Sequence, residues 1–303
     1  EETLPGGAGR AVGAAAGGTA ADTADISVPG ILFAQHAAIA SLPAAGVDIT
    51  GAAAPAAAIG HSQGVLGVAL LQALTRADTI DEEQVVEVHA IARLIGAAAA
   101  RDTRRLDLGT VGESTPMLSV RGVTRQVLDA VLSRVPGAES LSIGVTNGRQ
   151  AHILSGRPAE LEAVVSALEA AARRSANDRK ERRRGGAVLN PVTEFLVTSV
   201  PFHTPLLAPA VEDVVAWAER AGLNTTLARE LAVAVLIDPV DWPALVDQAL
   251  ASTGSRLVVD LGPGTVLTRL TEAIVAGTGT TVIPAGTARS IDDLDRPGAT
   301  PVA

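Results

Sequence analysis

The chain has 303 residues, 47% of them hydrophobic, and its 24 Lys and Arg are outnumbered by 33 Asp and Glu, for a net charge of −9. This length allows one large domain with a smaller insert, and the acidic balance argues against a nucleic-acid-binding surface. The lack of cysteine excludes disulfides and thiolate metal sites, and the stretch Gly60–Gln63 interrupts the best candidate for a membrane span.

The first residues do not form a signal peptide, because they lack its basic and apolar regions. Together with the missing cysteines, this favours a cytoplasmic protein whose sequence begins here inside a longer polypeptide. Residues 1–26 are rich in Gly, Ala and Thr and predict a loop or tail. From Pro29 the apolar spacing predicts a core helix that includes Phe33 and ends near Leu42.

A serine then stands between two glycines at the junction of a predicted strand and a predicted helix. The strand covers 51–59, with Pro55 at a position that a buried strand tolerates, and the helix covers Val65–Leu74. Gly60-His61-Ser62-Gln63-Gly64 is therefore a G-x-S-x-G motif in its required context. In such a sharp turn we expect no room for side chains at residues 60 and 64.

The turn presents the Ser62 hydroxyl at the amino end of the following helix. The free N–H groups and the positive dipole end of that helix favour negative charge that develops beside Ser62. The alternative is a glycine-rich turn whose serine only caps the helix. Because the context fits on both sides, we predict that Ser62 is a nucleophile.

A second long helix is predicted from Asp81 to Ala100, and beyond Pro116 the pattern becomes alternating. The expected strands are Met117–Val120, Leu141–Val145, His152–Ser155 and Glu194–Val200, and the expected helices are Thr124–Val135 and Pro158–Ala172. This β-α-β-β-α-β order predicts a ferredoxin-like subdomain at 117–200. It would be inserted into a larger α/β core formed by 1–116 and 201–290, with 291–303 as a linker.

The run Arg173–Arg184 is strongly basic. It is either a contact for the phosphates of a nucleotide-like cofactor or, as charged runs usually are, a solvated loop. After it, helices are predicted at Leu207–Ala221 and Leu227–Leu236, and another from Asp241. A buried strand Arg256–Leu261 leads through Gly262-Pro263-Gly264 into the helix Val266–Val275, and since a Gly-Lys-Ser/Thr ending is missing, we interpret this as a structural turn.

A serine nucleophile needs a base within hydrogen-bond reach. His203 stands where a predicted strand gives way to a loop, between Pro201 and Pro205, and strand ends commonly display functional histidines. The other four histidines lie on predicted helices, within a strand or beside the serine: His36, His89, His152 and His61. No aspartate stands at a strand end between Ser62 and His203, and this argues against an esterase of the α/β-hydrolase order.

These residues resemble a known family. Gly60–Gly64, Pro201–His203 and Asp260–Gly264 are similar to motifs of the acyltransferase domains of fatty acid and polyketide synthases. Three further stretches, Ser27–Gln35, Pro116–Val120 and Ser142–Gly148, resemble the acetyltransferase domain of type I fatty acid synthases of the fungal and actinobacterial kind. The resemblance covers residues from about 26 to 285 of the 303.

The resemblance implies an α/β-hydrolase-like acyltransferase core with an inserted ferredoxin-like subdomain. It implies that Ser62 takes an acyl group from CoA, with His203 as base and then as acid for the departing thiol. The acyl group would pass to the phosphopantetheine thiol of an acyl carrier protein within a homo-oligomeric multienzyme, with no tightly bound cofactor and no metal. The histidine of the family is oriented by a backbone carbonyl, here expected to be that of Val235.

The resemblance also implies which acyl group is transferred. Malonyl-specific members carry an arginine followed by glycine on the second helix, whose guanidinium pairs with the free carboxylate. Here the corresponding residues are Ile95-Gly96, and Arg93 lies about 200° away around the helix. Because an unpaired carboxylate in an apolar pocket is costly, we expect acetyl, with Phe202 as a further limit on acyl size.

One family feature has no counterpart. The family uses the N–H of the residue after the nucleophile, here Gln63, and a second N–H from a Gly-Gln-Gly loop near its start. This chain contains no Gly-Gln-Gly, and Gly6–Gly9 is not a convincing replacement, so the loop is expected outside this sequence.

Arg182, Arg183 and Arg184 are candidate contacts for the CoA phosphates. The alternatives to acetyl transfer are a malonyl or palmitoyl transferase, a thioesterase-like serine hydrolase, or a silent scaffolding domain.

Overall fold

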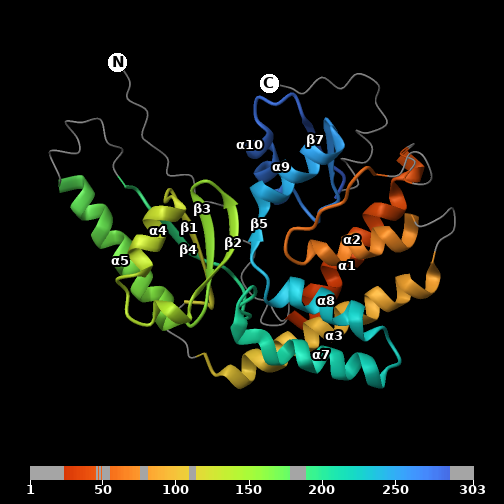
Figure 1. Cartoon of the computed structure of the whole chain (residues 1–303), viewed down its shortest axis with the longest axis horizontal. Helices are drawn as coiled ribbons and strands as arrows, with labels where there is room; N and C mark the ends of the chain where they lie inside the picture. The colour runs from red at the N-terminus through yellow and green to blue at the C-terminus, as the bar shows by residue number, and fades with distance from the viewer. Residues whose placement is uncertain are drawn as a thin grey trace, which may run out of the picture.

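The computed structural model describes residues 24–45, 47, 49, 55–75, 81–108, 114–177 and 189–286. Three groups of elements make up the fold (Figure 1). A sheet with two helices lies on one side, a layer of long helices lies at the base, and a small α/β unit lies above that layer. Short 3-10 turns occur at Pro43–Ala45, Ala138–Ser140 and Pro205–Leu207.

The main hydrophobic core lies among five helices. They are α1 (Ala24–Ser41), α2 (Gly64–Thr75), α3 (Glu82–Leu106), α7 (Ala208–Arg220) and α8 (Thr225–Leu236). The acidic first turn of α3 follows an Asp81 cap, as its sequence predicts, and α3 continues six residues beyond the predicted end at Ala100.

Helix α1 differs from its prediction at two points. It begins at Ala24, so the predicted tail ends before residue 26. Its buried face runs through Val28, Leu32 and Ile39, at helical spacing. Phe33 points to the opposite face and is 70% exposed, so its prediction as a core residue is wrong.

The second group follows the predicted β-α-β-β-α-β order. Its elements are β1 (Met117–Arg121), α4 (Arg125–Leu132), β2 (Ser142–Gly148), β3 (Ala151–Ser155), α5 (Pro158–Asn177) and β4 (Val192–Phe195). These strands form an antiparallel sheet in the order β4-β1-β3-β2, and β5 (Val240–Asp241) adds to β2 in parallel. A separate cluster of buried apolar side chains lies wholly within 118–195.

Two predictions in this region need correction. The last strand ends at Phe195, because Thr198 N–H donates back to the Leu196 carbonyl and Val200 N–H to the Thr198 hydroxyl, which turns the chain. Helix α5 continues to Asn177, so the first residues of the basic run Arg173–Arg184 are helical. The rest of that run lies outside the described residues.

The third group consists of α9 (Trp242–Thr253), β6 (Leu257–Asp260), α10 (Val266–Val275) and β7 (Thr281–Pro284). Strands β6 and β7 pair in parallel as a two-stranded sheet. Leu257 is 54% exposed, so the prediction of a buried strand is wrong for β6. A parallel strand is normally buried on both faces, but among the described residues β6 has a strand neighbour, β7, on one edge only.

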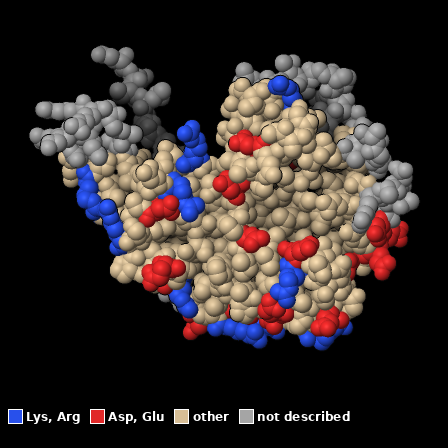
Figure 2. All heavy atoms as spheres, viewed as in Figure 1, with Lys and Arg blue, Asp and Glu red and all other residues tan. Residues whose placement is uncertain are grey.

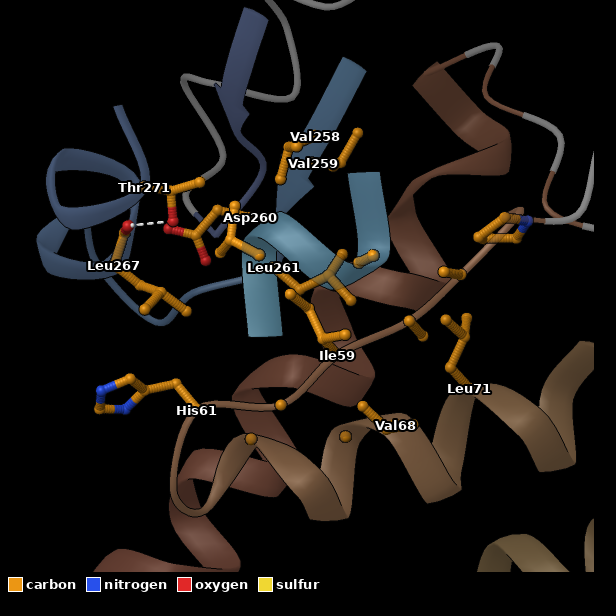
Figure 3. Close-up of a pocket in the computed structure, with 18 of the residues that line it drawn as sticks. Ile59, His61, Val68, Leu71, Val258, Val259, Asp260, Leu261, Leu267 and Thr271 are labelled. Carbon is orange, nitrogen blue, oxygen red and sulfur yellow. Dashed lines mark hydrogen bonds between the residues drawn. The ribbon is translucent and has the colours of Figure 1, made fainter. Parts of the chain in front are cut away.

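The described part of the predicted strand 51–59 pairs with no other strand. Residues 55–60 run as an irregular segment into the serine turn, and 51–54 lie outside the described residues. A cavity of about 360 Å³ separates this segment from β6, with Ile59 on one wall and Val258 and Val259 on the other (Figure 3). The two backbones therefore do not come within hydrogen-bonding distance as neighbouring strands.

The described surface carries mixed charge. In Figure 2 the acidic and basic side chains on the visible face are interspersed and separated by wide uncharged areas. None of the described helices has the length and apolar character that a membrane span requires.

Replacing Gly96 by alanine is expected to push α3 away from the start of α1. A Cβ atom at residue 96 would lie 2.4 Å from the Ala24 carbonyl oxygen, and such overpacking costs about 1–3 kcal/mol. The matched control is Gly30→Ala on α1, where a Cβ meets nothing within 4 Å and helix propensity adds up to ~1 kcal/mol. Chemical denaturation measures both free energies of unfolding, and equal values would contradict the close contact at Gly96.

Candidate active site

Ser62 lies in a tight turn at the start of α2. Its φ angle of 53° is in the left-handed region, and the turn is closed by hydrogen bonds from Gly64 N–H to His61 O and from Val65 N–H to Ser62 O. A Cβ atom at Gly60 would lie 2.3 Å from the Val65 nitrogen, so glycine is required there. At Gly64 the nearest contact would be 3.9 Å away, so the prediction that both glycines are sterically required is wrong for Gly64.

The structure brings His203 to Ser62. The distance from Ser62 Oγ to His203 Nε2 is 2.7 Å, and that from His203 Nδ1 to the Asp238 carbonyl oxygen is also 2.7 Å. Because a carbonyl oxygen only accepts, Nδ1 carries the proton, and Nε2 is left to accept from the Ser62 hydroxyl. This is the arrangement of a serine hydroxyl with a general base.

The carbonyl that orients His203 belongs to Asp238, so the prediction of Val235 is wrong. Val235 lies inside α8, where carbonyls point along the helix axis toward the next turn. The helix ends at Leu236, and Asp238 N–H donates back to the Val233 carbonyl. This turn directs the Asp238 carbonyl away from the helix and toward the imidazole.

His203 is held in an uncommon conformation by its neighbours. Its φ angle is 60°, so Ser62 and His203 are two of the three non-glycine residues with positive φ among those described. Such conformations cost about 1–3 kcal/mol each and persist where the surroundings enforce them. Thr204 N–H donates to the Leu236 carbonyl 3.1 Å away, which fixes the backbone directly after His203.

Strand β2 packs against the other side of His203. A Cβ atom added at Gly144 would lie 2.8 Å from His203 Cβ and 3.1 Å from the Ser155 hydroxyl oxygen. The Ser142 hydroxyl donates to Thr204 Oγ1 at 3.3 Å. His203 therefore lies between the end of α8 and the sheet of the second group.

Burial sets the protonation state of His203. Its side chain is 1% exposed, and burial lowers its pKa from 6.5 to about 4, against the opposing effect of the bond to Asp238 and with a further lowering by nearby His61. At neutral pH the imidazole is uncharged, as a base must be before it accepts a proton.

His61 turns away from Ser62 and binds the second group. Its Nε2 lies 2.7 Å from Asn147 Oδ1 on β2, and its ring meets the Trp242 indole edge-on with 5.4 Å between centroids. Burial lowers the pKa of His61, and the bond to Asn147 only partly offsets this effect. Sequence reasoning missed the role of Asn147, although it lies within the stretch Ser142–Gly148 that carried part of the resemblance.

The predicted contributors to the site lie as follows. The backbone N–H of Gln63, the expected oxyanion donor, lies directly before α2. It makes no hydrogen bond within the described part of the chain. Ile95 and Phe202 are both buried in the main core, 0% and 7% exposed. Neither lines the cavity beside the turn. Arg182, Arg183 and Arg184 lie outside the described residues.

The remaining histidines lie away from this pair. His36 on α1 and His89 on α3 share a hydrogen bond of 2.9 Å, and His152 is buried on β3. No group of three or more potential metal ligands occurs among the described residues. The cavity beside the turn is lined by His61 and Gly60 and by β6, but neither Ser62 nor His203 contributes to its wall (Figure 3).

Comparison with known proteins shows what this chain is similar to. Residues 116–195 match the family model of the fatty acid synthase central AT domain. The chain is 29% identical over 256 residues to the fatty acid synthase beta subunit aflB of Emericella nidulans, with 74% of this chain covered. It is 26% identical over 273 residues to the fatty acid synthase subunit beta of Schizosaccharomyces pombe, with 78% of this chain covered.

Residues 116–195 thus resemble the central AT domain of fatty acid synthases, and the chain is similar to fungal fatty acid synthase beta subunits. It spans only 12% and 13% of the length of these two relatives. The acyltransferase fold recurs in solved structures. FabD from Acinetobacter baumannii has a TM-score of 0.65 at 19% identity, covering 91% of this chain and 81% of its own.

A malonyl-transacylase solved in complex with a type II polyketide synthase acyl-carrier protein gives a TM-score of 0.63 at 19% identity, over 89% of this chain and 80% of that one. At these identities the likeness concerns the fold alone. Within the acyltransferase fold of this chain, the serine turn, His203 and the Asp238 carbonyl are contributed by three separate segments.

Gly60→Ala is expected to lower the free energy of unfolding by about 2 kcal/mol or more, because its Cβ would overlap backbone atoms of Val65. Gly64→Ala is the matched control in the same motif and is expected to stay within ~0.5 kcal/mol of the parent, since its Cβ has room. Urea denaturation compares the two. A larger loss for Gly64→Ala than for Gly60→Ala would contradict the steric account of the turn.

Proposed function

We propose that this chain is an acetyltransferase domain that moves an acetyl or other short acyl group from CoA through Ser62 to the phosphopantetheine thiol of an acyl carrier protein. The observation that carries the proposal is the pair of 2.7 Å bonds that join Ser62 Oγ to His203 Nε2 and His203 Nδ1 to a backbone carbonyl. The kinship with fatty acid synthase acyltransferase domains supports it.

The reaction follows from these contacts. His203 Nε2 takes the hydroxyl proton as Ser62 Oγ attacks the thioester carbonyl, and Gln63 N–H is placed to donate to the oxyanion. When the tetrahedral intermediate collapses, the C–S bond breaks and His203 returns the proton to the departing CoA sulfur. In the second half the carrier thiol gives its proton to His203, attacks the acyl-serine, and the proton returns to Ser62.

The backbone carbonyl that accepts from His203 Nδ1 favours an acyltransferase over a hydrolase with an aspartate triad. In a hydrolytic triad a buried carboxylate stabilises the imidazolium that forms. Here the hydrogen-bond partners of His203 within the described residues are the Ser62 hydroxyl and the Asp238 carbonyl. A neutral carbonyl fixes the tautomer of the imidazole but supplies less charge stabilisation than a carboxylate.

The environment of α3 supports an uncharged acyl group. Ile95 is fully buried in the apolar main core, and Arg93 lies exposed on another face of the helix. A malonyl carboxylate near Ile95 would thus have no cation from this part of α3. Phe202, which is buried and directly precedes His203 in the chain, would further limit the size of the acyl group.

The domain arrangement and the partners belong to the same proposal. The topology and separate core of 118–195 support a ferredoxin-like subdomain inserted at 117–200 between core parts 1–116 and 201–290, with 291–303 as linker. The fold likeness to a transacylase solved with its carrier protein supports a carrier domain as acceptor within a multienzyme. We propose no tightly bound cofactor, and contacts of Arg182–Arg184 with CoA stay a prediction.

Incubation with radiolabelled acetyl-CoA is expected to trap an acyl-enzyme on Ser62, and Ser62→Ala is expected to abolish the label. Ser252→Ala is the control, because its exposed hydroxyl donates to the Ala249 carbonyl within its own helix, α9. Malonyl-CoA is expected to label at least tenfold more slowly. Labelling by malonyl-CoA alone would refute the acetyl preference. Steady release of free acetate would indicate a hydrolase, and no labelling by any acyl-CoA would indicate a silent domain.

The acylation rate is expected to be nearly independent of pH from about 5.5 upward and to fall as His203 becomes protonated near its lowered pKa of about 4. Between pH 6.5 and 4 the unfolded state binds this proton while the native state does not, so stability should decline as the pH falls through that window. Single-turnover acylation across pH measures the first effect. A fall in the acylation rate centred near pH 6.5 would contradict the lowering of the His203 pKa by burial.

A further inference from the structure

Strand β2 contains two local irregularities. Its pairing with β3 shifts register between Ile143 and Val145 and again between Thr146 and Gly148. Such bulges bend a strand and redirect individual residues, and they occur often beside active sites. The residue inside the first irregularity is Gly144, and the residue inside the second is Asn147.

Asn147 contacts the serine side of the candidate site. Its Oδ1 lies 2.7 Å from Nε2 of His61, the residue directly before Ser62. The His61 ring also rests against Trp242, whose Nε1 donates to the Thr271 hydroxyl at 3.1 Å. Thr271 in turn donates to the Leu267 carbonyl, so the contact continues into α10 (Figure 3).

Gly144 contacts the histidine side. The absence of a Cβ there lets the β2 backbone approach His203 Cβ, which a side chain at residue 144 would meet at 2.8 Å. Two residues earlier, the Ser142 hydroxyl donates to Thr204. One strand therefore contacts His203 itself and the residue directly before Ser62, through residues only three positions apart.

We propose that the doubly bulged strand β2 sets the distance between Ser62 and His203, with Asn147 and His61 as positioning residues for the serine and Gly144 as the contact that places the histidine. This inference rests on the proposed function, because it assigns the residues that hold the same nucleophile and base. It gives the second group of elements a direct part in the reaction geometry.

The chemistry of the His61–Asn147 bond fits a positioning role. An amide oxygen only accepts, so His61 Nε2 carries the proton and the neutral ring is the donor. Burial lowers the pKa of His61, so the ring that donates to Asn147 at neutral pH is uncharged. The bond also fixes the orientation of residue 61 in a turn whose next residue has positive φ.

The test compares Asn147→Ala, His61→Ala and the double variant by single-turnover labelling with acetyl-CoA. Each single change is expected to slow acylation about 10- to 100-fold at saturating acetyl-CoA, because small misplacement of a nucleophile has effects of this size. The acetyl-CoA concentration that gives half of the maximal acylation rate should change little. Since the two residues act as one unit, the double variant should be no slower than the slower single variant.

Two further variants separate positioning from general destabilisation. His61→Gln retains a side-chain N–H donor and is expected to recover part of the rate lost in His61→Ala. His89→Ala is the matched control, because it removes a histidine hydrogen bond of similar length, 2.9 Å, to His36 rather than to β2. It is expected to lower the melting temperature without slowing acylation more than twofold.

NMR titration of the histidine rings gives a readout that does not depend on acyl transfer. The five histidines should give separate signals. In Asn147→Ala the pKa of His203 is expected to rise by ~1 unit from about 4, since a looser turn admits water to the ring. An unchanged His203 pKa together with parent-like labelling rates would overturn the inference. If the parent protein takes no label, the proposed function fails, and the titration alone then decides whether Asn147 holds the serine turn against His203.

Discussion

The hydrogen bond between Ser62 Oγ and His203 Nε2 is the contact on which the arrangement of the site depends. It joins residues 141 positions apart in the chain, and both have positive φ angles that ordinary side chains avoid. Neither conformation would persist alone, so each needs a surrounding that enforces it. The close approach of Gly60 to Val65 enforces the first, and the end of α8 together with β2 enforces the second.

The second group of elements contributes to this arrangement although it has its own core. Its buried apolar residues form a cluster within 118–195, separate from the helical core that contains Phe202 and Leu207. It contacts the rest of the chain through Met117 on β1, which is buried in the main core, and through β2, whose Asn147 and Gly144 reach the serine turn and His203. A group of elements with its own core can act as a rigid support, because its internal packing does not depend on the site that it contacts.

The sequence predicted those parts of the fold and site that have local causes. The turn at Gly60 follows from backbone crowding over five residues, and the helices follow from apolar spacing. The carbonyl that accepts from His203 could not be predicted, because every residue has a carbonyl. The direction of the Asp238 carbonyl depends on how α8 ends. The strand predicted at residues 51–59 is not formed in its described part for the same reason. Apolar composition indicates a strand but cannot show whether a neighbouring strand lies alongside it.

The low pKa of His203 explains how a carbonyl can replace the acid of a triad. A carboxylate strengthens the base but also holds the proton on the imidazole. In the proposed reaction, an imidazolium buried beside the Asp238 carbonyl would be a comparatively strong acid and would return its proton readily to a departing sulfur. Because thiols are far more acidic than alcohols, the thiolate leaves with little assistance. A weak base that releases its proton easily thus suits reversible exchange between thioesters and a serine ester, which is the chemistry of carrier-protein loading.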